Sequence, residues 1–153
     1  MQFVVDTSCL ILLQKLNWLD EFLCHAEDIF ICPPRVMQEV KNDKKLLKWL
    51  KIGTVAVIAV NKSMSITGIS ETDNEVVALA TEKNWSILSE DLLLRQKAEK
   101  LAIPAFNLAE LIVLYYQYAR IDQDACINRL NALFAKAALS KTAYRELVEI
   151  IKS

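Results

Sequence analysis

The chain has few of the residues on which most nucleotide-binding and catalytic motifs depend. Its 153 residues include two glycines, three prolines and one histidine. Two glycines are too few for the GxGxxG and GxxxxGK loops that cradle phosphates. Because His25 stands alone, neither a histidine-based zinc site nor a serine–histidine triad is expected. We interpret His25 as an ordinary surface or helix-end residue.

Long apolar runs, an excess of charge and paired cysteines are also missing. The longest apolar runs, such as TVAVIAV at 54–60, fall far short of the roughly 18 residues of a membrane helix. No basic segment precedes the first apolar stretch, so no signal peptide is expected. The net charge of −1 does not by itself indicate a nucleic-acid partner. The four cysteines form no CxxC pair and are interpreted as reduced thiols of a cytoplasmic protein.

What the chain does contain is a regular alternation of strand-like and helix-like segments. Short stretches rich in Val, Ile and Phe predict strands, and stretches with apolar residues at helical spacing predict helices. The predicted strands are 2–5, 28–32, 54–60, 85–89 and 103–106. The predicted helices are 8–17, 18–23, one after Pro33–Pro34, 43–51 closed by Gly53, 70–83, 91–101, and three from Leu108 onward with breaks near Ile121 and Ser140.

This alternation implies crossover connections, and therefore an α/β fold with a mainly parallel sheet covered on both faces. No internal repeat or shift of composition divides the chain, so 1–153 is predicted to be a single domain with a core at 1–107 and a helical extension at 108–153. Ligands of such folds bind beyond the carboxyl ends of the strands. Asp6 lies at such an end, directly after the apolar segment QFVV.

Asp6 and Glu39 each have a structural and a functional interpretation. An aspartate at a strand-to-helix turn commonly caps the helix that follows. The hydroxyls of Thr7 and Ser8 offer another cap, which would free the Asp6 carboxylate. Glu39 shares a helix face with Val36, so it points toward the boundary between apolar and polar surface. A partly buried ion pair is the alternative for Glu39.

Two further acids follow the same logic. Glu75 lies beside the packed stripe of its helix and past the first turn, whereas capping and the helix dipole account for Glu71 and Asp73. Asp91 follows a strand and precedes a helix, so it is either a functional acid or a helix-terminal charge. The helix-terminal interpretation is stronger for its neighbour Glu90.

Taken together, the four acids can meet on one rim of the sheet. Asp6 and Asp91 end strands, and Glu39 and Glu75 lie in helices that follow strands. Carboxylates in one pocket repel one another, and a divalent cation removes that repulsion. Oxygen ligands favour Mg²⁺ or Mn²⁺, and such a site can activate water against a phosphodiester. The hypothesis that follows from the pattern is a divalent-metal site formed by these four acids.

The order of these motifs resembles the PIN domain, a metal-dependent nuclease fold. The stretches that carry the resemblance are VVDTSCLI, PPRVMQEV, ETDNEVVALA and SILSEDLLLRQKAEKLAIPAF, within residues 2–107. The chain is most similar to the small prokaryotic ribonucleases of toxin–antitoxin pairs. The resemblance implies a parallel sheet of about five strands between helices, with an acidic metal site at the strand ends.

The resemblance also implies roles for individual residues. It assigns the metal-binding and catalytic positions to four acids, Asp6, Glu39, Glu75 and Asp91. It implies a supporting hydroxyl at Thr7 or Ser8, and Glu90 is the neighbouring candidate acid. Two departures stand out, since Glu75 occupies a position where many members have Asp and the segment LSED is less regular than the family form.

Basic residues are the candidates for substrate contacts. Lys44 and Lys48 lie on one face of the predicted helix 43–51, where they form either a solvated face or a track for the phosphate backbone. Arg95 follows Asp91 by one helical turn, and it is either a phosphate-holding residue or an ordinary surface arginine.

The segment LIVLYYQYAR suggests a surface for a partner. Tyr115, Tyr116 and Tyr118 lie so close together in the sequence that they cannot all face one core. Part of this aromatic surface is therefore expected to be exposed or covered by a partner, with base stacking, a protein interface and ordinary helix packing as the interpretations.

These observations lead to one prediction with two alternatives. The prediction is a Mg²⁺- or Mn²⁺-dependent endoribonuclease acting on RNA, and the resemblance adds an inhibitory antitoxin-type protein and a homodimer as partners, with no membrane partner. The first alternative is a nuclease of the same fold for DNA or structured junctions. The second is a catalytically degenerate PIN-like module that serves interactions.

Overall fold

The computed structural model describes residues 1–23, 27–51 and 55–153. Cys24, His25 and Gly53, which were interpreted above, lie outside these residues. The chain divides into two compact units, Met1–Phe106 and Asn107–Ser153, each described by itself below. The predicted boundary between core and extension, at residue 107, lies beside this division. That the two units form one domain stays a prediction.

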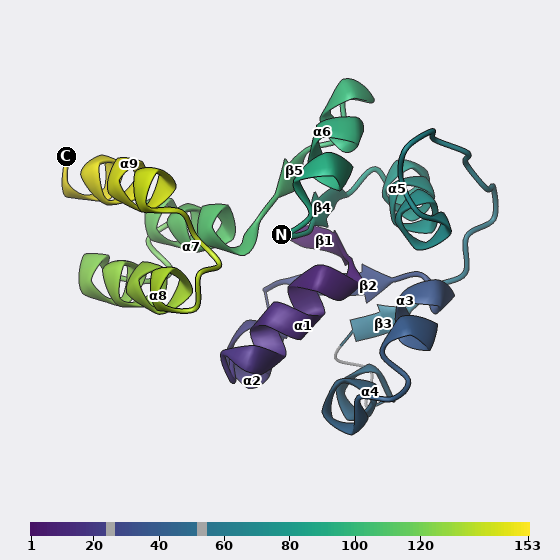
Figure 1. The fold of residues 1–153 in the computed structure, drawn as a ribbon, viewed down its shortest axis with the longest axis horizontal. Helices are drawn as coiled ribbons and strands as arrows, with labels where there is room; N and C mark the ends of the chain where they lie inside the picture. The colour runs from purple at the N-terminus through teal and green to yellow at the C-terminus, as the bar shows by residue number, and fades with distance from the viewer. Residues whose placement is uncertain (24–26, 52–54) are drawn as a thin grey trace. The chain divides into compact units, whose positions relative to one another are not determined.

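The first unit contains a parallel five-stranded sheet, as predicted (Figure 1). Its strands run in the order β3-β2-β1-β4-β5, so β1 lies at the centre. Their bounds are β1 (Gln2–Val5), β2 (Ile29–Cys32), β3 (Val55–Val57), β4 (Ser86–Leu88) and β5 (Ala105–Phe106). Because parallel strands need crossover connections, a helix or helix pair joins each strand to the next.

The helices of this unit cover both faces of the sheet. They are α1 (Thr7–Lys15), α2 (Leu19–Leu23), α3 (Pro34–Glu39), α4 (Lys44–Lys51), α5 (Glu71–Lys83) and α6 (Leu92–Lys100). Chain order moves from β1 outward to β3 and then back across to β4 and β5. Right-handed crossovers therefore place α1, α2 and α4 on one side and α5 and α6 on the other, as Figure 1 shows.

The core explains why the strands are almost continuously apolar. Phe3, Val4 and Val5 of the central strand are all buried, because helices pack against both faces. The Phe3 ring stacks on Phe30 of β2 at 5.8 Å between centroids and meets Phe106 of β5 edge-on at 6.2 Å. The central strand is thus held by packing, and the residue that follows it, Asp6, is held in place with it.

The prediction of a strand over 54–60 is wrong in its length. Within the described residues of that segment, β3 covers only Val55–Val57, at the edge of the sheet. Its one partner strand, β2, is followed by Pro33, which has no N–H to donate. The last bond of this ladder runs from the Ile58 amide to the Cys32 carbonyl. Beyond it the chain forms a loop whose amides at Asn61 and Lys62 bind the Glu82 carboxylate.

The second unit consists of α7 (Leu108–Gln117), α8 (Gln123–Ala135) and α9 (Lys141–Lys152), as predicted for the extension. Asn107 and Glu110 form a capping box at the start of α7. Helices α7 and α8 pack together, as do α8 and α9. The apolar residues of these short amphipathic helices bury one another, which is the main source of stability for such helices.

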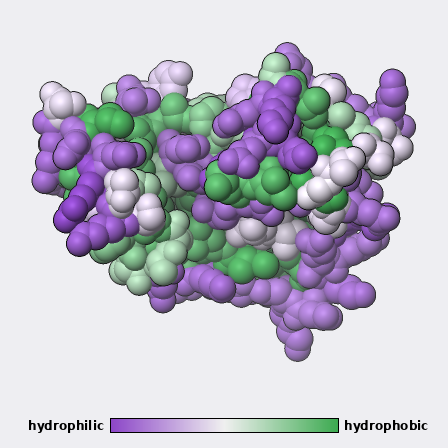
Figure 2. All heavy atoms as spheres, turned by 45° about the horizontal axis from the view of Figure 1, so that its top comes forward, coloured by the Kyte–Doolittle hydropathy of each residue, from purple (hydrophilic) through white to green (hydrophobic). Residues whose placement is uncertain are grey.

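The three tyrosines of α7 and its C-terminal cap have different surroundings. Tyr115 is buried, with the Arg120 guanidinium 4.3 Å from its ring centroid. The Tyr116 hydroxyl donates to the Ile151 carbonyl at 3.3 Å. Tyr118 is 68% exposed. Part of this aromatic group is therefore exposed, as predicted; Figure 2 shows other apolar side chains reaching the surface among hydrophilic ones.

Two expectations from composition concern the membrane and the thiols. No helix in the described part of the chain is long and apolar enough to cross a membrane. Cys9, Cys32 and Cys126 are free and buried. Burial raises the pKa of all three thiols, so these cysteines act as small apolar core residues.

Candidate functional site

The site lies where the chain reverses direction across the sheet. β1 and β4 are neighbours, but the helices that follow them, α1 and α6, leave toward opposite faces. Open α/β sheets bind ligands beyond the carboxyl ends of the strands at such a switch point, and we call this position the crevice. Asp6 follows β1, and the segment Ser89–Glu90–Asp91 follows β4. Their backbones are joined by a hydrogen bond from the Asp6 amide to the Leu88 carbonyl at 3.2 Å.

Asp6 is the buried acid of this crevice, with 3% of its surface exposed. The Ser8 hydroxyl lies 2.7 and 2.8 Å from its two carboxylate oxygens, and the Cys9 amide donates to Oδ1 at 3.0 Å. The Ser89 hydroxyl donates to Oδ2. Burial raises the pKa of Asp6 from 3.8 to about 6, although these hydrogen bonds lower it, and the charge of Asp73 raises it further.

Two serine hydroxyls connect Asp6 to the loop after β4. Ser8 Oγ accepts a hydrogen bond from the Glu90 amide at 3.0 Å, and Ser89 Oγ accepts one from the Asp91 amide at 3.0 Å. Ser89 is fully buried. Each hydroxyl therefore donates to the Asp6 carboxylate and accepts from the loop, which fixes the loop relative to the end of β1. The Ser8 hydroxyl thus binds Asp6, and Glu90 contributes its backbone amide; the supporting roles predicted for both residues stay predictions.

Arg95 contributes to the same loop. Its Nη1 donates to the Ser89 carbonyl at 2.8 Å, and the side chain is half-buried. The arginine thus fixes the backbone on which Asp91 lies. Whether its remaining N–H groups also hold a phosphate stays a prediction.

Asp6 and Asp91 both cap helices. Asp6 accepts from the Cys9 amide at the start of α1, and Asp91 accepts from the Leu94 amide at 3.1 Å at the start of α6. The suggestion that Thr7 or Ser8 would cap in place of Asp6 is wrong, because the Ser8 hydroxyl binds the Asp6 carboxylate and Thr7 turns to Glu39. Capping and a functional role coexist, since an aspartate has two oxygens with several acceptor positions.

Glu39 is brought to the start of α1 by a hydroxyl. Thr7 Oγ1 donates to Glu39 Oε2, which joins the first residue of α1 to the last residue of α3. Glu39 itself is exposed. Thr7 thus binds Glu39 rather than Asp6, and its predicted supporting role stays a prediction.

Asp73 is the acid at the centre of the electrostatic interactions. It lies in the first turn of α5, where the Ser70 hydroxyl accepts from its amide at 3.1 Å. Burial raises the pKa of Asp73, hydrogen bonds with Ser70 lower it, and the charges of Asp91 and Glu39 raise it. Asp73 in turn raises the pKa of Asp6. The Asp73 carboxylate thus interacts electrostatically with Asp6, Glu39 and Asp91. From the sequence, Asp73 was assigned to the start of its helix alone.

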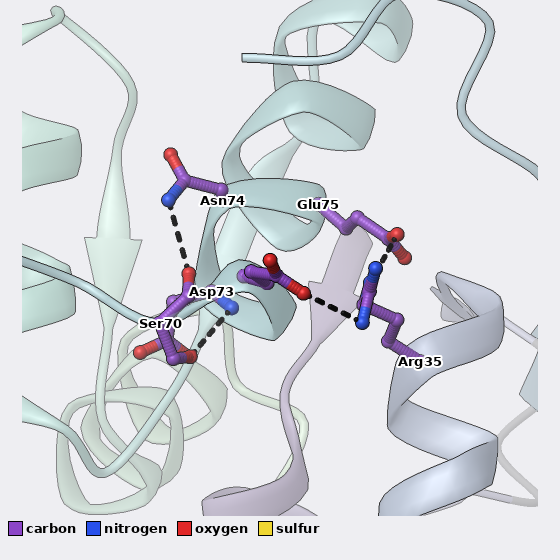
Figure 3. A network of polar contacts seen from close by, with 6 residues as sticks. Arg35, Ser70, Asp73, Asn74 and Glu75 are labelled. Carbon is purple, nitrogen blue, oxygen red and sulfur yellow. Dashed lines mark hydrogen bonds and ion pairs between the residues drawn. The ribbon is translucent and has the colours of Figure 1, made fainter. Parts of the chain in front are cut away.

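Glu75 points toward a different partner. Its Oε1 accepts from Arg35 Nε at 2.8 Å, and Arg35 Nη1 lies 2.9 Å from Glu71 Oε2 (Figure 3). Arg35 thereby ties α3 to α5. From the sequence, a partly buried ion pair was the alternative interpretation of Glu39. In the structure, Glu75 is the residue that forms such a pair.

Lys44 and Lys48, the predicted substrate-binding lysines, are exposed residues of α4. This helix follows α3 after a short turn, and it contacts α1 and β3. Neither lysine is part of the hydrogen-bonded network around Asp6. Their role stays a prediction.

The donor chemistry of the crevice fits a divalent cation, although the ligands are not gathered into a closed set. Among the residues that the structure describes, no three acidic, histidine or cysteine side chains lie close enough together to hold an ion. Yet Asp6 and Asp73 both have raised pKa values with a neighbouring carboxylate among the causes. A cation coordinated by hard oxygen ligands relieves this kind of repulsion. Glu39 and Asp91 are exposed, and each of their carboxylates has one oxygen besides the one that binds Thr7 or the Leu94 amide.

Three residues of this arrangement were missed at the sequence level. Asp73 was assigned to the start of its helix. A sequence signal for a further role is that the first turn already has another acid, Glu71, to interact with the helix dipole. Ser89 gave one signal, its position at the end of a buried strand. No sequence signal marked Arg35, because its ion pair with Glu75 joins residues 40 positions apart and depends on how α3 and α5 cross.

The chain was compared with known families and structures. The family model DUF3368, described as a PIN domain, matches residues 2–153. A PilT N-terminus domain protein from the hyperthermophilic archaeon Sulfolobus solfataricus P2 has a similar fold, with a TM-score of 0.57, 18% sequence identity, and coverage of 72% of this chain and 90% of that one. A domain of a functionally unknown protein from Methanocaldococcus jannaschii DSM 2661 has a TM-score of 0.49, 19% identity, and coverage of 70% and 90%. No curated protein matches the chain.

Proposed function

This chain belongs to the PIN-domain family DUF3368, and on that premise we propose that it is a divalent-metal-dependent endoribonuclease. PIN domains are typically metal-dependent nucleases, which makes hydrolysis of a phosphodiester the expected reaction class. The observation that carries the proposal is the position of Asp6. Asp6 is buried at the switch point of a parallel sheet, and its pKa is raised to about 6, mainly by burial and further by the charge of Asp73 on α5. Glu39 and Asp91 in turn raise the pKa of Asp73.

The ligand set that we propose is Asp6, Glu39, Asp73 and Asp91. Asp73 replaces Glu75 in this set because Asp73 interacts electrostatically with Glu39 and Asp91, whereas Glu75 is bound to Arg35. When bound, Mg²⁺ or Mn²⁺ supplies Lewis-acid chemistry, favouring deprotonation of a water and neutralising charge on the phosphodiester.

The protein's own groups orient the acids. Ser8 and Ser89 hold both oxygens of Asp6, and through the amides of Glu90 and Asp91 they hold the β4–α6 loop at the same place. Thr7 orients Glu39. The first turns of α1 and α6 begin at this edge of the sheet, and the positive ends of their dipoles favour a negatively charged phosphate.

Cleavage of single-stranded RNA with Mn²⁺ tests the proposal. The wild-type protein should cleave and Asp6→Asn should not, whereas Asp20→Asn, which changes an exposed acid of α2, should cleave like the wild type. Equal activity of Asp6→Asn and wild type would contradict the assignment. Competition with single-stranded and branched DNA separates RNA from the DNA alternative.

One observation favours the second alternative, a catalytically degenerate interaction module. In the part of the chain that the structure describes, the acids do not form a preassembled group of three. Thermal melting distinguishes the two functions, because a ligand that binds only the folded state raises the melting temperature. A rise with millimolar Mn²⁺ that Asp6→Asn abolishes supports the nuclease, and no rise supports the module. A toxin-type role, with an inhibitory protein or a second copy of the chain as partner, is a further part of the proposal and rests on the resemblance.

A further inference from the structure

Helix α4 carries lysines at positions where their charges destabilise the helix. Lys44 and Lys45 lie in its first turn, which contains no acid, although the positive end of the helix dipole disfavours cations there. Lys44 and Lys48 are four residues apart, so like charges lie one above the other on the helix surface, which is also destabilising.

No ion pair within residues 1–23, 27–51 and 55–153 relieves these charges. Among the described residues, Lys44, Lys45 and Lys48 have no carboxylate within ion-pairing distance, and all three are exposed. The nearest acid in the sequence, Asp43, accepts instead from the amides of Lys45 and Leu46 and from the Gln14 side chain. On the opposite side of the helix, Leu46 and Leu50 are buried. The lysine face is therefore fixed outward with its charges unneutralised.

Helix α1 connects the acidic crevice to the lysine face. Helix α1 begins at Thr7, which binds Glu39, and its far end reaches α4, where the Lys45 ammonium donates to Asn17 Oδ1 at 3.0 Å. The nine residues of α1 span about 14 Å. A stacked nucleic-acid strand rises about 3.4 Å per nucleotide, so roughly four nucleotides cover this distance.

We infer that the face of α4 formed by Lys44, Lys45 and Lys48 binds phosphates of a single RNA strand roughly four nucleotides from the bond that the acidic crevice cleaves. The inference rests on the proposed function and adds to it how the substrate strand runs. Exposed lysines without acidic partners are suited to phosphate contacts. Unfavourable charge arrangements such as the one at the start of α4 occur chiefly at functional sites. Because these contacts read only the backbone, they add affinity without sequence preference.

Salt-dependent binding tests the inference. Anisotropy of a fluorescein-labelled single-stranded RNA of roughly 12 nucleotides, three times the reach above, is measured in EDTA at several KCl concentrations. Lys44→Gln/Lys48→Gln should lower the slope of log affinity against log salt by about 1.4 and weaken binding about tenfold at low salt, since each contact to a single strand contributes about 0.7.

The matched control is Lys83→Gln/Lys100→Gln. It makes the same change of charge on α5 and α6, which lie on the opposite face of the sheet from α1 and α4. This control should bind like the wild type. An equal loss in both double variants, or none in the α4 variant, overturns the inference.

A length series gives a readout that helix stability does not affect. With Mn²⁺, the α4 variant should cleave a dinucleotide as the wild type does, because that substrate does not reach α4, and should lose about tenfold in kcat/KM only on the longer RNA. An equal loss on both lengths overturns the inference while leaving the nuclease intact. Stronger α4-dependent binding of duplex DNA than of single-stranded RNA also overturns it. A wild-type protein that neither binds nor cleaves RNA overturns the proposed function and this inference together.

Discussion

Arg35 Nε donates to Glu75 Oε1 at 2.8 Å, and together with the Arg35–Glu71 ion pair this contact joins the start of α3 to the start of α5. Two residues earlier on α5, Asp73 lies about 200° around the helix and therefore on a nearly opposite face. One face of α5 thus binds α3 through Arg35 (Figure 3). Asp73, on the other face, interacts electrostatically with Asp6, Glu39 and Asp91. The helix both carries a candidate ligand and positions the element that carries another.

The two acids of α5 should respond differently to neutralisation. Asp73→Asn removes a proposed ligand and should lower Mn²⁺ affinity and RNA cleavage by more than about 100-fold. Glu75→Gln removes only a supporting contact and should cost about 10- to 100-fold at most, the range for groups that orient ligands. Mn²⁺ titration followed by calorimetry checks the order. If Glu75→Gln has the larger effect, Glu75 is the ligand, as predicted from the sequence.

Exchanging the ion pair tests its positioning role. Arg35→Glu alone sets three glutamates against one another and should weaken Mn²⁺ binding and lower the melting temperature. Arg35→Glu combined with Glu75→Arg restores an opposite pair and should recover most of both losses. A ligand at position 75 could not survive replacement by arginine, so failure of the double variant to recover Mn²⁺ binding, with its melting temperature restored, would contradict the positioning role.

The pKa of Asp6 predicts how stability changes with pH in the absence of metal. Because this pKa rises from 3.8 to about 6 on folding, the folded protein keeps a proton that the unfolded chain releases. The stabilising contribution is complete below pH 3.8 and is lost as the pH rises through about 6. Asp6→Asn removes the buried charge and should be more stable than the wild type above pH 6, by at most about 3 kcal/mol, with little difference near pH 4. Urea unfolding in EDTA measures this.

Mn²⁺ should reverse that order of stabilities. The wild-type protein gains free energy of unfolding when metal binds its folded state, and Asp6→Asn does not. Asp20→Asn, an exposed acid, serves as the control and should follow the wild type in both conditions. An Asp6→Asn variant that is less stable than wild type in EDTA at pH 7 would show that its hydrogen bonds outweigh the cost of its burial.

Ser89 should matter as a positioning residue for two acids. Its hydroxyl donates to Asp6 and accepts from the Asp91 amide at 3.0 Å, in a fully buried position. Ser89→Ala leaves that amide unpaired and should cost about 1–3 kcal/mol of stability, while Mn²⁺ affinity falls about 10- to 100-fold. Ser86→Ala, at the other end of β4, is the control for a serine-to-alanine change on the same strand. Unchanged Mn²⁺ affinity in Ser89→Ala would limit its role to stability.

Much of the fold followed from local pattern. The strand at QFVV, the proline-started helix after β2 and the capped helix from Ser70 are each determined by neighbours in the sequence, and the structure contains all three. The segment TVAVIAV was misjudged because strand length depends on the partner, and β2 ends at Pro33. Apolar composition predicts burial, but it does not show where a hydrogen-bonded neighbour stops.

The sequence by itself determined that acids follow β1 and β4, because strand ends and helix starts are local features that Asp6 and Asp91 mark. It also determined the α/β class, through the alternation of periods. Only the tertiary structure distinguishes Glu75, which pairs with Arg35, from Asp73, the ligand that we propose in its place. Both lie in the first two turns of one helix, and which of them meets the other acids depends on the angle at which α5 crosses α3 and on a long-range contact with Arg35. Such contacts join residues far apart in the chain, so no local pattern encodes them.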